Sequence, residues 1–337
     1  MKTWKSKHGV YLIAEIGGNH EGDFTKAKEL AELACKSGVD AVKFQIYTAD
    51  SLVNKVEDRE RHAHFKKFEL TPEQHIALAQ ICQKNKVTYL ASVWDMNAFE
   101  WIDPYMDYYK IGSGDLTAYP FLKRIAKIGK PMIISTGLAT LEEVRNTVAL
   151  VQSVDKRYND ANYLALLQCT SSYPLPESDV NLSVMKTLQD EFDVTVGYSD
   201  HTTDSYAAEL AVCMGAEILE LHFTDDKERP SFRDHQVSFT IQGISNLIDN
   251  IERIKKLQGS PDKHPTESEI ESGHVNSFRR GIYASHDIPK GKIISKNDLI
   301  VLRPNHGLDA RLLKKIIGKK IKKDLNHYDS FNEDMFN

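Results

Sequence analysis

Ionisable and hydroxyl-bearing side chains stand at the ends of short apolar runs over the first two thirds of the sequence. Seven of eight such runs end this way, as in YLIAE, KIGSGD and GYSDH. One His or Lys at such a position is more often structural, but a repeated pattern is typical of residues that surround one active site. The set comprises Glu15, Lys43, Gln45, Lys110, Ser113, Asp115, Ser135, Ser199, His201 and His222.

The lysines and serines of this set could bind a phosphate. Ser113, Ser135 and Ser199 stand next to a glycine or two residues from one, so hydroxyls and exposed backbone N–H groups can converge on phosphate oxygens. Lys43 and Lys110 would neutralise the charge. The chain has neither a Walker GxxxxGK[ST] motif nor a GxGxxG motif after its first apolar run, which disfavours nucleoside triphosphates. The pattern predicts a phosphorylated, anionic substrate.

Two histidines could share a divalent metal ion. His201 and His222 end the last two apolar runs, and two neutral imidazoles leave coordination positions open for water and substrate, as in a catalytic Lewis-acid site. The alternative is that each histidine hydrogen-bonds its own loop, and spacing alone does not decide between the two. Glu15, Asp115 and Asp234 supply carboxylates for proton transfer, but their roles cannot be divided from the sequence.

The elements that must position these residues alternate between short β-branched or aliphatic runs and longer amphipathic segments. Alternation of this kind predicts parallel strands joined by helices, and eight such units predict a (β/α)8 TIM barrel whose carboxyl strand ends surround one site. Asp23 is the expected N-cap of the first helix, and Thr140 with Glu143 forms a capping-box pattern. The expected strands are Tyr11–Ala14, Ala41–Phe44, Thr88–Ala91, Tyr108–Ile111, Met132–Ser135, Tyr163–Leu167, Val194–Gly197 and Ile218–Leu221.

The chain changes character after the barrel pattern. We expect a catalytic barrel over residues 1–258, a polar linker over 259–275 and a small domain over 276–337. The last segment has a formal charge of +6 and residues 1–275 have −11. The basic lysines form either a solvated face or a surface that docks on an acidic barrel, its own or a partner's.

Composition excludes several classes of protein. The chain of 337 residues is 41% hydrophobic and 27% charged, which is ordinary for a globular protein, and its net charge of −5 argues against a nucleic-acid partner. No apolar run approaches the roughly 20 residues that span a membrane. The four cysteines lie far apart, so we expect a reduced, cytoplasmic protein. Cys169 could be a nucleophile, although a small buried residue at a strand end is the favoured interpretation.

The motifs, taken together and in order, resemble those of the sialic acid synthases, which make N-acetylneuraminic, legionaminic and pseudaminic acids. The resemblance covers nearly the whole chain, and the tail from about Asn276 is similar to the family's SAF, or antifreeze-like, domain, which is small and mainly β. The matching segments are AEIGGNHEG, AVKFQ, YKIGSGDL, ISTG, LLQCTSSYPLP, GYSDHT, HFT and FRRGIYASHDIPKGKIISKNDLIVLRP.

The resemblance implies a transferase that condenses phosphoenolpyruvate with an N-acylated mannose-type aldose, releases phosphate and forms a nine-carbon 2-keto acid. It also implies a divalent ion, Mn²⁺ or Mg²⁺, held by His201 and His222. The family forms a domain-swapped homodimer, in which Arg303 from the partner subunit would reach the sugar pocket. The matching residues for phosphoenolpyruvate are Lys43, Lys110, Ser113, Ser135, Ser171 and Ser199. Those for the sugar and for proton transfer are Glu15, Asp115, Tyr173 and Asp234, with Lys43 also counted as catalytic.

The chain departs from the family pattern at several positions. Gln168 replaces the usual His, and Leu221 stands where Lys or Arg is common, from which we expect an altered pocket with retained activity. The loop SFRDH is one residue longer than the usual GPDH, which leaves Asp234 uncertainly placed and adds Arg233 near the sugar. Arg233 is either a surface arginine, the favoured interpretation, or a contact for a phosphorylated or otherwise acidic acceptor. The segment 51–68, which helps line the sugar pocket in relatives, offers no residue to carry over, so the acceptor is undefined.

Two other functions fit parts of the pattern. A Schiff-base aldolase would use Lys43 or Lys110 as nucleophile and would be trapped by borohydride. A non-catalytic sugar-binding homologue would keep the fold and lose turnover.

Overall fold

The computed structural model describes residues 4–229 and 231–336. The chain divides into two compact units, Met1–Gly259 and Ser260–Asn337. In the described residues, no helix has both the length and the apolar character needed to span a membrane.

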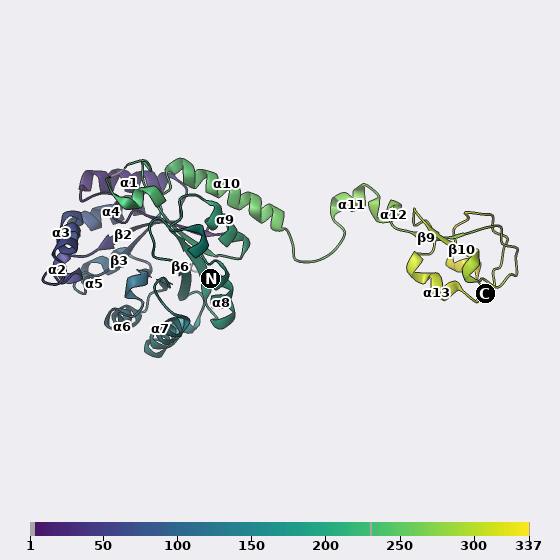
Figure 1. The fold of residues 1–337 in the computed structure, drawn as a ribbon, viewed down its shortest axis with the longest axis horizontal. Helices are drawn as coiled ribbons and strands as arrows, with labels where there is room; N and C mark the ends of the chain where they lie inside the picture. The colour runs from purple at the N-terminus through teal and green to yellow at the C-terminus, as the bar shows by residue number, and fades with distance from the viewer. Residues whose placement is uncertain (1–3, 230, 337) are drawn as a thin grey trace. The chain divides into compact units, whose positions relative to one another are not determined.

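The first unit is a closed barrel of eight parallel strands that pair in chain order, with β8 returning to β1 (Figure 1). The structure confirms the predicted fold class and all eight expected strands. Most strands extend one to three residues further than expected at their carboxyl ends, so several polar side chains of the predicted site lie within the sheet. The strands are β1 (Tyr11–Glu15), β2 (Ala41–Ile46), β3 (Thr88–Val93), β4 (Tyr109–Ile111), β5 (Met132–Ser135), β6 (Leu164–Cys169), β7 (Thr195–Asp200) and β8 (Ile218–His222).

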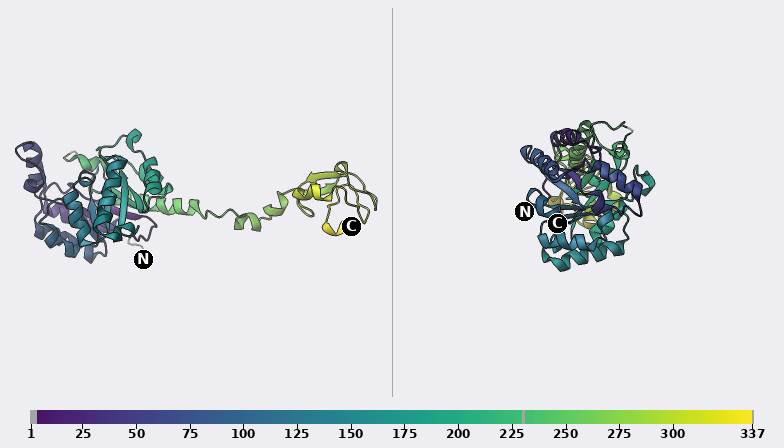
Figure 2. Two further views of the ribbon diagram at one scale, coloured as in Figure 1. Left: turned by 90° about the horizontal axis from the view of Figure 1, so that it is seen from below. Right: turned by 90° about the vertical axis from the view of Figure 1, so that its left-hand side faces the viewer.

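Helices surround the strands on the outside, as Figures 1 and 2 show from several directions. Asp23 caps the first of them by accepting hydrogen bonds from the backbone N–H groups of Thr25 and Lys26, and Thr140 and Glu143 form the predicted capping box. The helices are α1 (Phe24–Lys36), α2 (Ala49–Leu52), α3 (Arg59–Phe68), α4 (Pro72–Lys84), α5 (Phe99–Ile102), α6 (Tyr119–Ile128), α7 (Leu141–Val154), α8 (Ser183–Glu191), α9 (Tyr206–Cys213) and α10 (Ile241–Gln258).

A cluster of buried side chains from the early positions of the strands lies below the site. It includes Trp4, Tyr11 and Tyr108, whose rings meet edge to face, and the two tyrosine hydroxyls hydrogen-bond each other. Gly197 on β7 is required here, since a Cβ atom would lie 2.4 Å from the carbonyl oxygen of Ile218. This cluster closes the lower part of the barrel, so the polar side chains further along the strands face the open end.

The second unit is small and contains an antiparallel pair of strands, β9 (Gly281–Ala284) and β10 (Leu299–Leu302), with a short helix α13 (Leu313–Ile316). Isolated bridges such as Ile288 to Leu325 extend the pairing around a separate apolar core. The expected linker over 259–275 contains the helix α11 (Glu267–Glu271), which begins at a capping box of Thr266 and Glu269, and α12 (His274–Ser277) follows. The residues of this capping box could have indicated the start of α11 from the sequence.

Candidate functional site

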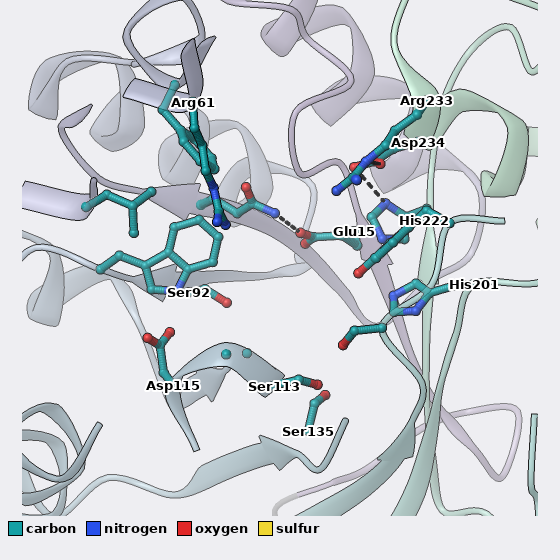
Figure 3. Close-up of a pocket in the computed structure, with 18 of the residues that line it drawn as sticks. Glu15, Arg61, Ser92, Ser113, Asp115, Ser135, His201, His222, Arg233 and Asp234 are labelled. Atoms are coloured by element: carbon teal, nitrogen blue, oxygen red, sulfur yellow. Dashed lines mark hydrogen bonds and ion pairs between the residues drawn. The ribbon is translucent and has the colours of Figure 1, made fainter. Parts of the chain in front are cut away.

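One pocket of about 1120 Å³ opens among the residues at the carboxyl ends of the barrel strands. Its lining includes twelve of the predicted site residues, and Figure 3 shows several of them pointing into a common space. Of the other predicted residues, Gln45 also lines the pocket and Arg303 belongs to the second unit. The twelve are Glu15, Lys43, Lys110, Ser113, Asp115, Ser135, Ser171, Tyr173, Ser199, His201, His222 and Asp234.

Two lysines and two glutamates form a buried cluster at the floor of the pocket. The Nζ atom of Lys43 lies 2.8 Å from Oε2 of Glu15 and 4.0 Å from Oε2 of Glu220, and Nζ of Lys110 lies 3.3 Å from Oε1 of Glu220. All four side chains are less than 10% exposed. The sheet register explains the pair of Glu15 and Lys43, which lie opposite each other across β1 and β2. The register also places Ser199 opposite Glu220 across β7 and β8.

The two lysines have pKa values shifted in opposite directions. Burial opposes the charge of Lys43, but the carboxylates of Glu15 and Glu220 outweigh burial and raise the pKa of Lys43. Burial lowers the pKa of Lys110, and the attraction of Glu220 only partly offsets it. Burial also opposes the charge of Glu220, but Lys110 and Lys43 hold the pKa of that carboxyl below its usual range. The charge on Lys110 therefore depends on Glu220.

The serines lie around Lys110 and the backbone of Gly137. The Nζ atom of Lys110 donates to the hydroxyl of Ser135 at 2.6 Å, and the backbone N–H of Gly137 donates to the hydroxyl of Ser113 at 3.1 Å. A Cβ atom on Gly137 would lie 2.7 Å from Oγ of Ser113 and 2.8 Å from Oγ of Ser171. Only glycine lets both hydroxyls approach this backbone, so the arrangement can place several donors around one anion.

The two histidines lie side by side, with ring centroids 5.3 Å apart. His201 follows β7, and its Nδ1 donates to the carbonyl oxygen of Thr170 at 2.8 Å, which leaves Nε2 as the free acceptor. His222 ends β8; its Nδ1 is buried, has no hydrogen-bond partner among the described residues and lies 4.0 Å from Oδ2 of Asp234. Burial, with the charges of His201, Lys43 and Arg233, lowers the pKa of His222 well below its usual range.

These residues fit a divalent metal ion. The imidazole of His222 is held neutral and has an unpartnered nitrogen, and His201 is oriented by a backbone carbonyl in the way that metal-binding histidines are. Within the described ranges, no group of three or more His, Cys, Asp or Glu side chains is arranged to hold a metal. The two imidazoles would be the protein's donors to such an ion, and the other positions would fall to water or substrate.

Asp234 reaches the pocket despite the longer SFRDH loop. A 3-10 turn over Arg233–Val237 places its carboxylate beside His222, and Nε of Arg233 donates to its Oδ1 at 3.2 Å. Burial raises the pKa of Asp234, against the charge of Arg233, and burial likewise raises the pKa of Asp115. Two carboxyl groups with raised pKa values, together with Tyr173 over the His201 ring, provide candidates for proton transfer.

Several residues of the pocket were not predicted from the sequence. Glu220 was missed, although strand alternation on β8 turns its side chain inward with that of His222. The segment around α2 and α3 forms one wall of the pocket and includes Asn54, Arg61 and Phe65. The resemblance indicated that segment 51–68 helps line the sugar pocket, but it assigned no residue there, because the wall depends on how the segment folds back over the barrel.

An interlocked aromatic group supports this wall; it comprises Phe68 and His64 of α3 and Phe232 of the loop after β8. Ring centroids of Phe68 and Phe232 lie 5.1 Å apart, and the His64 ring stacks on Phe232 at 6.0 Å. A Cβ atom on Gly18 would meet the Phe232 ring at 2.9 Å, and one on Gly22 would meet the Lys67 carbonyl at 2.0 Å. The loops after β1 and β8 and the helix α3 therefore pack on one another.

The expectation of an altered pocket at two departures from the family pattern is wrong. Gln168 points away from the pocket, with Nε2 donating to the carbonyl of Val180, and Leu221 is buried in the core outside the strands. Neither residue belongs to the pocket lining. Alternation along β6 and β8 turns both side chains outward. Cys169 is a buried residue at the end of β6, as expected.

Comparisons with known proteins find similar families and relatives along most of the chain. Residues 30–263 match the NeuB family and residues 279–327 match the SAF domain. The N,N'-diacetyllegionaminic acid synthase of Legionella pneumophila is 38% identical over 97% of this chain and 94% of its own. The pseudaminic acid synthase of Campylobacter jejuni strain 81-176 is 31% identical, over 97% and 96%. The crystal structure of an N-acetylneuraminic acid synthetase from Leptospira borgpetersenii superposes with a TM-score of 0.72 and 30% identity over 79% and 90%.

Proposed function

The chain belongs to the NeuB family, and on this premise we propose that its barrel condenses phosphoenolpyruvate with an N-acylated mannose-type or related 6-deoxy aldose to a nine-carbon 2-keto sugar acid. The protein is a nonulosonic acid synthase, a transferase-type enzyme that releases phosphate. One observation carries the proposal: a lysine–serine anion site and a histidine pair share a single pocket. The family membership also confirms the resemblance found in the sequence.

In the proposed reaction, C3 of phosphoenolpyruvate forms a bond to the aldehyde carbon of the acceptor. Water adds at C2, the C2–O bond to phosphate breaks, and phosphate leaves. The two protons of the water end on the new hydroxyl group and on the released phosphate. The lysines and serines of the pocket would bind the phosphate and carboxylate of phosphoenolpyruvate and hold C3 toward the acceptor; these are Lys43, Lys110, Ser113, Ser135, Ser171 and Ser199.

Glu15, Asp115 and Asp234 are the groups proposed to hold and move protons. Glu15 and Asp234 flank His222 (Figure 3). Burial raises the pKa of Asp234, which favours a proton donor there, whereas Glu15 is ion-paired with Lys43. Tyr173 would contact the sugar. A divalent ion, Mn²⁺ or Mg²⁺, held by His201 and His222 would polarise the aldehyde oxygen and favour attack on it.

The assembly and location are also proposals. The SAF match supports a domain-swapped homodimer in which Arg303 of the partner subunit enters the sugar pocket. The cytoplasmic location follows from the cysteine pattern of the sequence, and cell fractionation tests it.

The test is phosphate release from phosphoenolpyruvate in the presence of Mn²⁺. The acceptors are N-acetylmannosamine, its 6-phosphate, and 2,4-diacetamido-2,4,6-trideoxy-mannose and -altrose, each assayed alone. Release that depends on one acceptor, with a 2-keto acid product, is expected. If folded protein loaded with metal releases no phosphate with any of these acceptors, the proposal is contradicted.

His201→Ala tests the metal assignment. We expect no metal-dependent turnover and loss of about one Mn²⁺ per chain in equilibrium dialysis, because one of two imidazole donors is removed. His8→Ala, at a half-buried histidine outside the pocket, is the matched control. Unchanged turnover and Mn²⁺ binding in His201→Ala would refute the assignment.

A further inference from the structure

Two arginines extend into the pocket from opposite sides. Arg61 comes from α3 and Arg233 from the loop after β8, and Figure 3 shows the two side chains extending toward Glu15 from its two sides. Both are exposed at the rim, whereas Lys43 and Lys110 are buried at the floor. The arginines are therefore separate from the cations proposed to bind phosphoenolpyruvate.

The guanidinium of Arg61 forms no ion pair or hydrogen bond with any other described side chain. The neighbouring carboxylate of Asp58 is used as the N-cap of α3, where it accepts from the backbone N–H of Arg61. The guanidinium lies over the Phe65 ring, 5.7 Å from its centroid, and that contact uses none of its N–H donors.

Arg233 is only partly engaged. Its Nε donates to Asp234, and the guanidinium carbon lies 4.8 Å from the centroid of the Tyr173 ring. The terminal nitrogens have no hydrogen-bond partner among the described residues, and the side chain is 67% exposed. It presents a second set of donors next to the residues proposed to hold the sugar.

From this pair we infer that the acceptor carries an anionic group, a phosphomonoester or a carboxylate, which Arg61 and Arg233 bind together. The inference rests on the proposed function, because it names the class of acceptor for the same pocket. Guanidinium groups bind both anions through paired N–H donors. The competing occupant is a neutral acylamino sugar, whose hydroxyls would meet Asn54 and Glu57 on the same wall.

The test compares acceptors that differ only at C6: N-acetylmannosamine, its 6-phosphate and N-acetylmannosaminuronate, with 2,4-diacetamido-2,4,6-trideoxy-mannose as the neutral rival. We expect the highest kcat/KM with the phosphate or the carboxylate, and the comparison distinguishes these two. Arg61→Gln should lower kcat/KM for that anionic acceptor by about tenfold to a hundredfold, the effect of losing a charge-assisted hydrogen bond. The KM for phosphoenolpyruvate should not change.

Arg59→Gln is the matched control, because it removes the same charge from the same helix outside the pocket. A second readout needs no turnover: calorimetric binding of the preferred anionic acceptor should weaken with added salt in the wild-type protein and less so in Arg61→Gln. If Arg61→Gln lowers kcat/KM equally for neutral and for anionic acceptors, the inference is overturned. Preference for a neutral acceptor would overturn it while the proposed function stands, whereas no phosphate release with any acceptor would end both.

Discussion

Replacing Glu220 with Gln should destabilise the barrel and alter binding of phosphoenolpyruvate, because this carboxylate is close to both buried lysines. At an effective dielectric constant of about 20, the 3.3 Å contact with Lys110 corresponds to about 5 kcal/mol and the 4.0 Å contact with Lys43 to about 4 kcal/mol. The substitution also removes the several kcal/mol that burying the carboxylate costs. The expected net loss in free energy of unfolding is about 3–5 kcal/mol.

The variant should also respond differently to pH. Without Glu220 the pKa of Lys110 falls further below its usual value. The lysines of the unfolded chain have pKa values of about 10.4, so below that pH the folded barrel binds fewer protons than the unfolded chain. The free energy of unfolding of Glu220→Gln should therefore rise with pH up to about 10.4. As the pH rises toward that value and Lys110 loses its proton, the KM for phosphoenolpyruvate should also rise, since neutral Lys110 no longer attracts the phosphate.

Urea unfolding followed by tryptophan fluorescence measures this change in the barrel alone, because Trp4, Trp94 and Trp101 all belong to the first unit. Glu228→Gln, at an exposed glutamate outside the pocket, is the control and should match the wild-type protein. A Glu220→Gln barrel within about 1 kcal/mol of that control, with unchanged KM and pH dependence, would refute the electrostatic reasoning.

Gly137→Ala should raise the KM for phosphoenolpyruvate about tenfold, because its Cβ forces the hydroxyls of Ser113 and Ser171 away from the anion site. Gly114→Ala, whose Cβ would have no neighbour within 4 Å, is the control, and equal effects would contradict the steric argument. Arg303→Ala should weaken use of the sugar while sparing phosphoenolpyruvate, as steady-state kinetics with each substrate varied would show. Mixing it with His201→Ala should restore about a quarter of wild-type activity if the arginine acts in the partner's pocket, and no recovery would count against that.

The sequence was sufficient to predict the strands and the residues that follow them. Strict alternation of apolar runs and amphipathic segments located β1 to β8, and parallel strands bring their carboxyl ends to one side, which is why Glu15, His201 and His222 could be grouped before the structure was known. The strand ends were placed short because polar residues such as Ser199 and His222 break the apolar pattern while the ladder continues.

The features that were missed depend on tertiary packing. Glu220 is a charged residue in an apolar strand, and its partners Lys43 and Lys110 come from strands far away in the sequence. Arg61 lies in a polar segment whose wall position depends on packing against Phe232. Alternate side chains of β6 point to opposite sides of the sheet. The position of Gln168 next to Cys169 in the sequence did not show which of the two faces the pocket.

The packing of α3 against the loops after β1 and β8 bears on how acceptor specificity could be exchanged between relatives. A transplanted segment 51–68 would bring its own residue at the position of Phe68, and that residue must fit Phe232, while Gly18 and Gly22 must stay small. These positions are far apart in the chain and would have to change together. Chimaeras that move the helix alone should express as poorly packed barrels, and those that also move residues 16–23 and 229–235 should not.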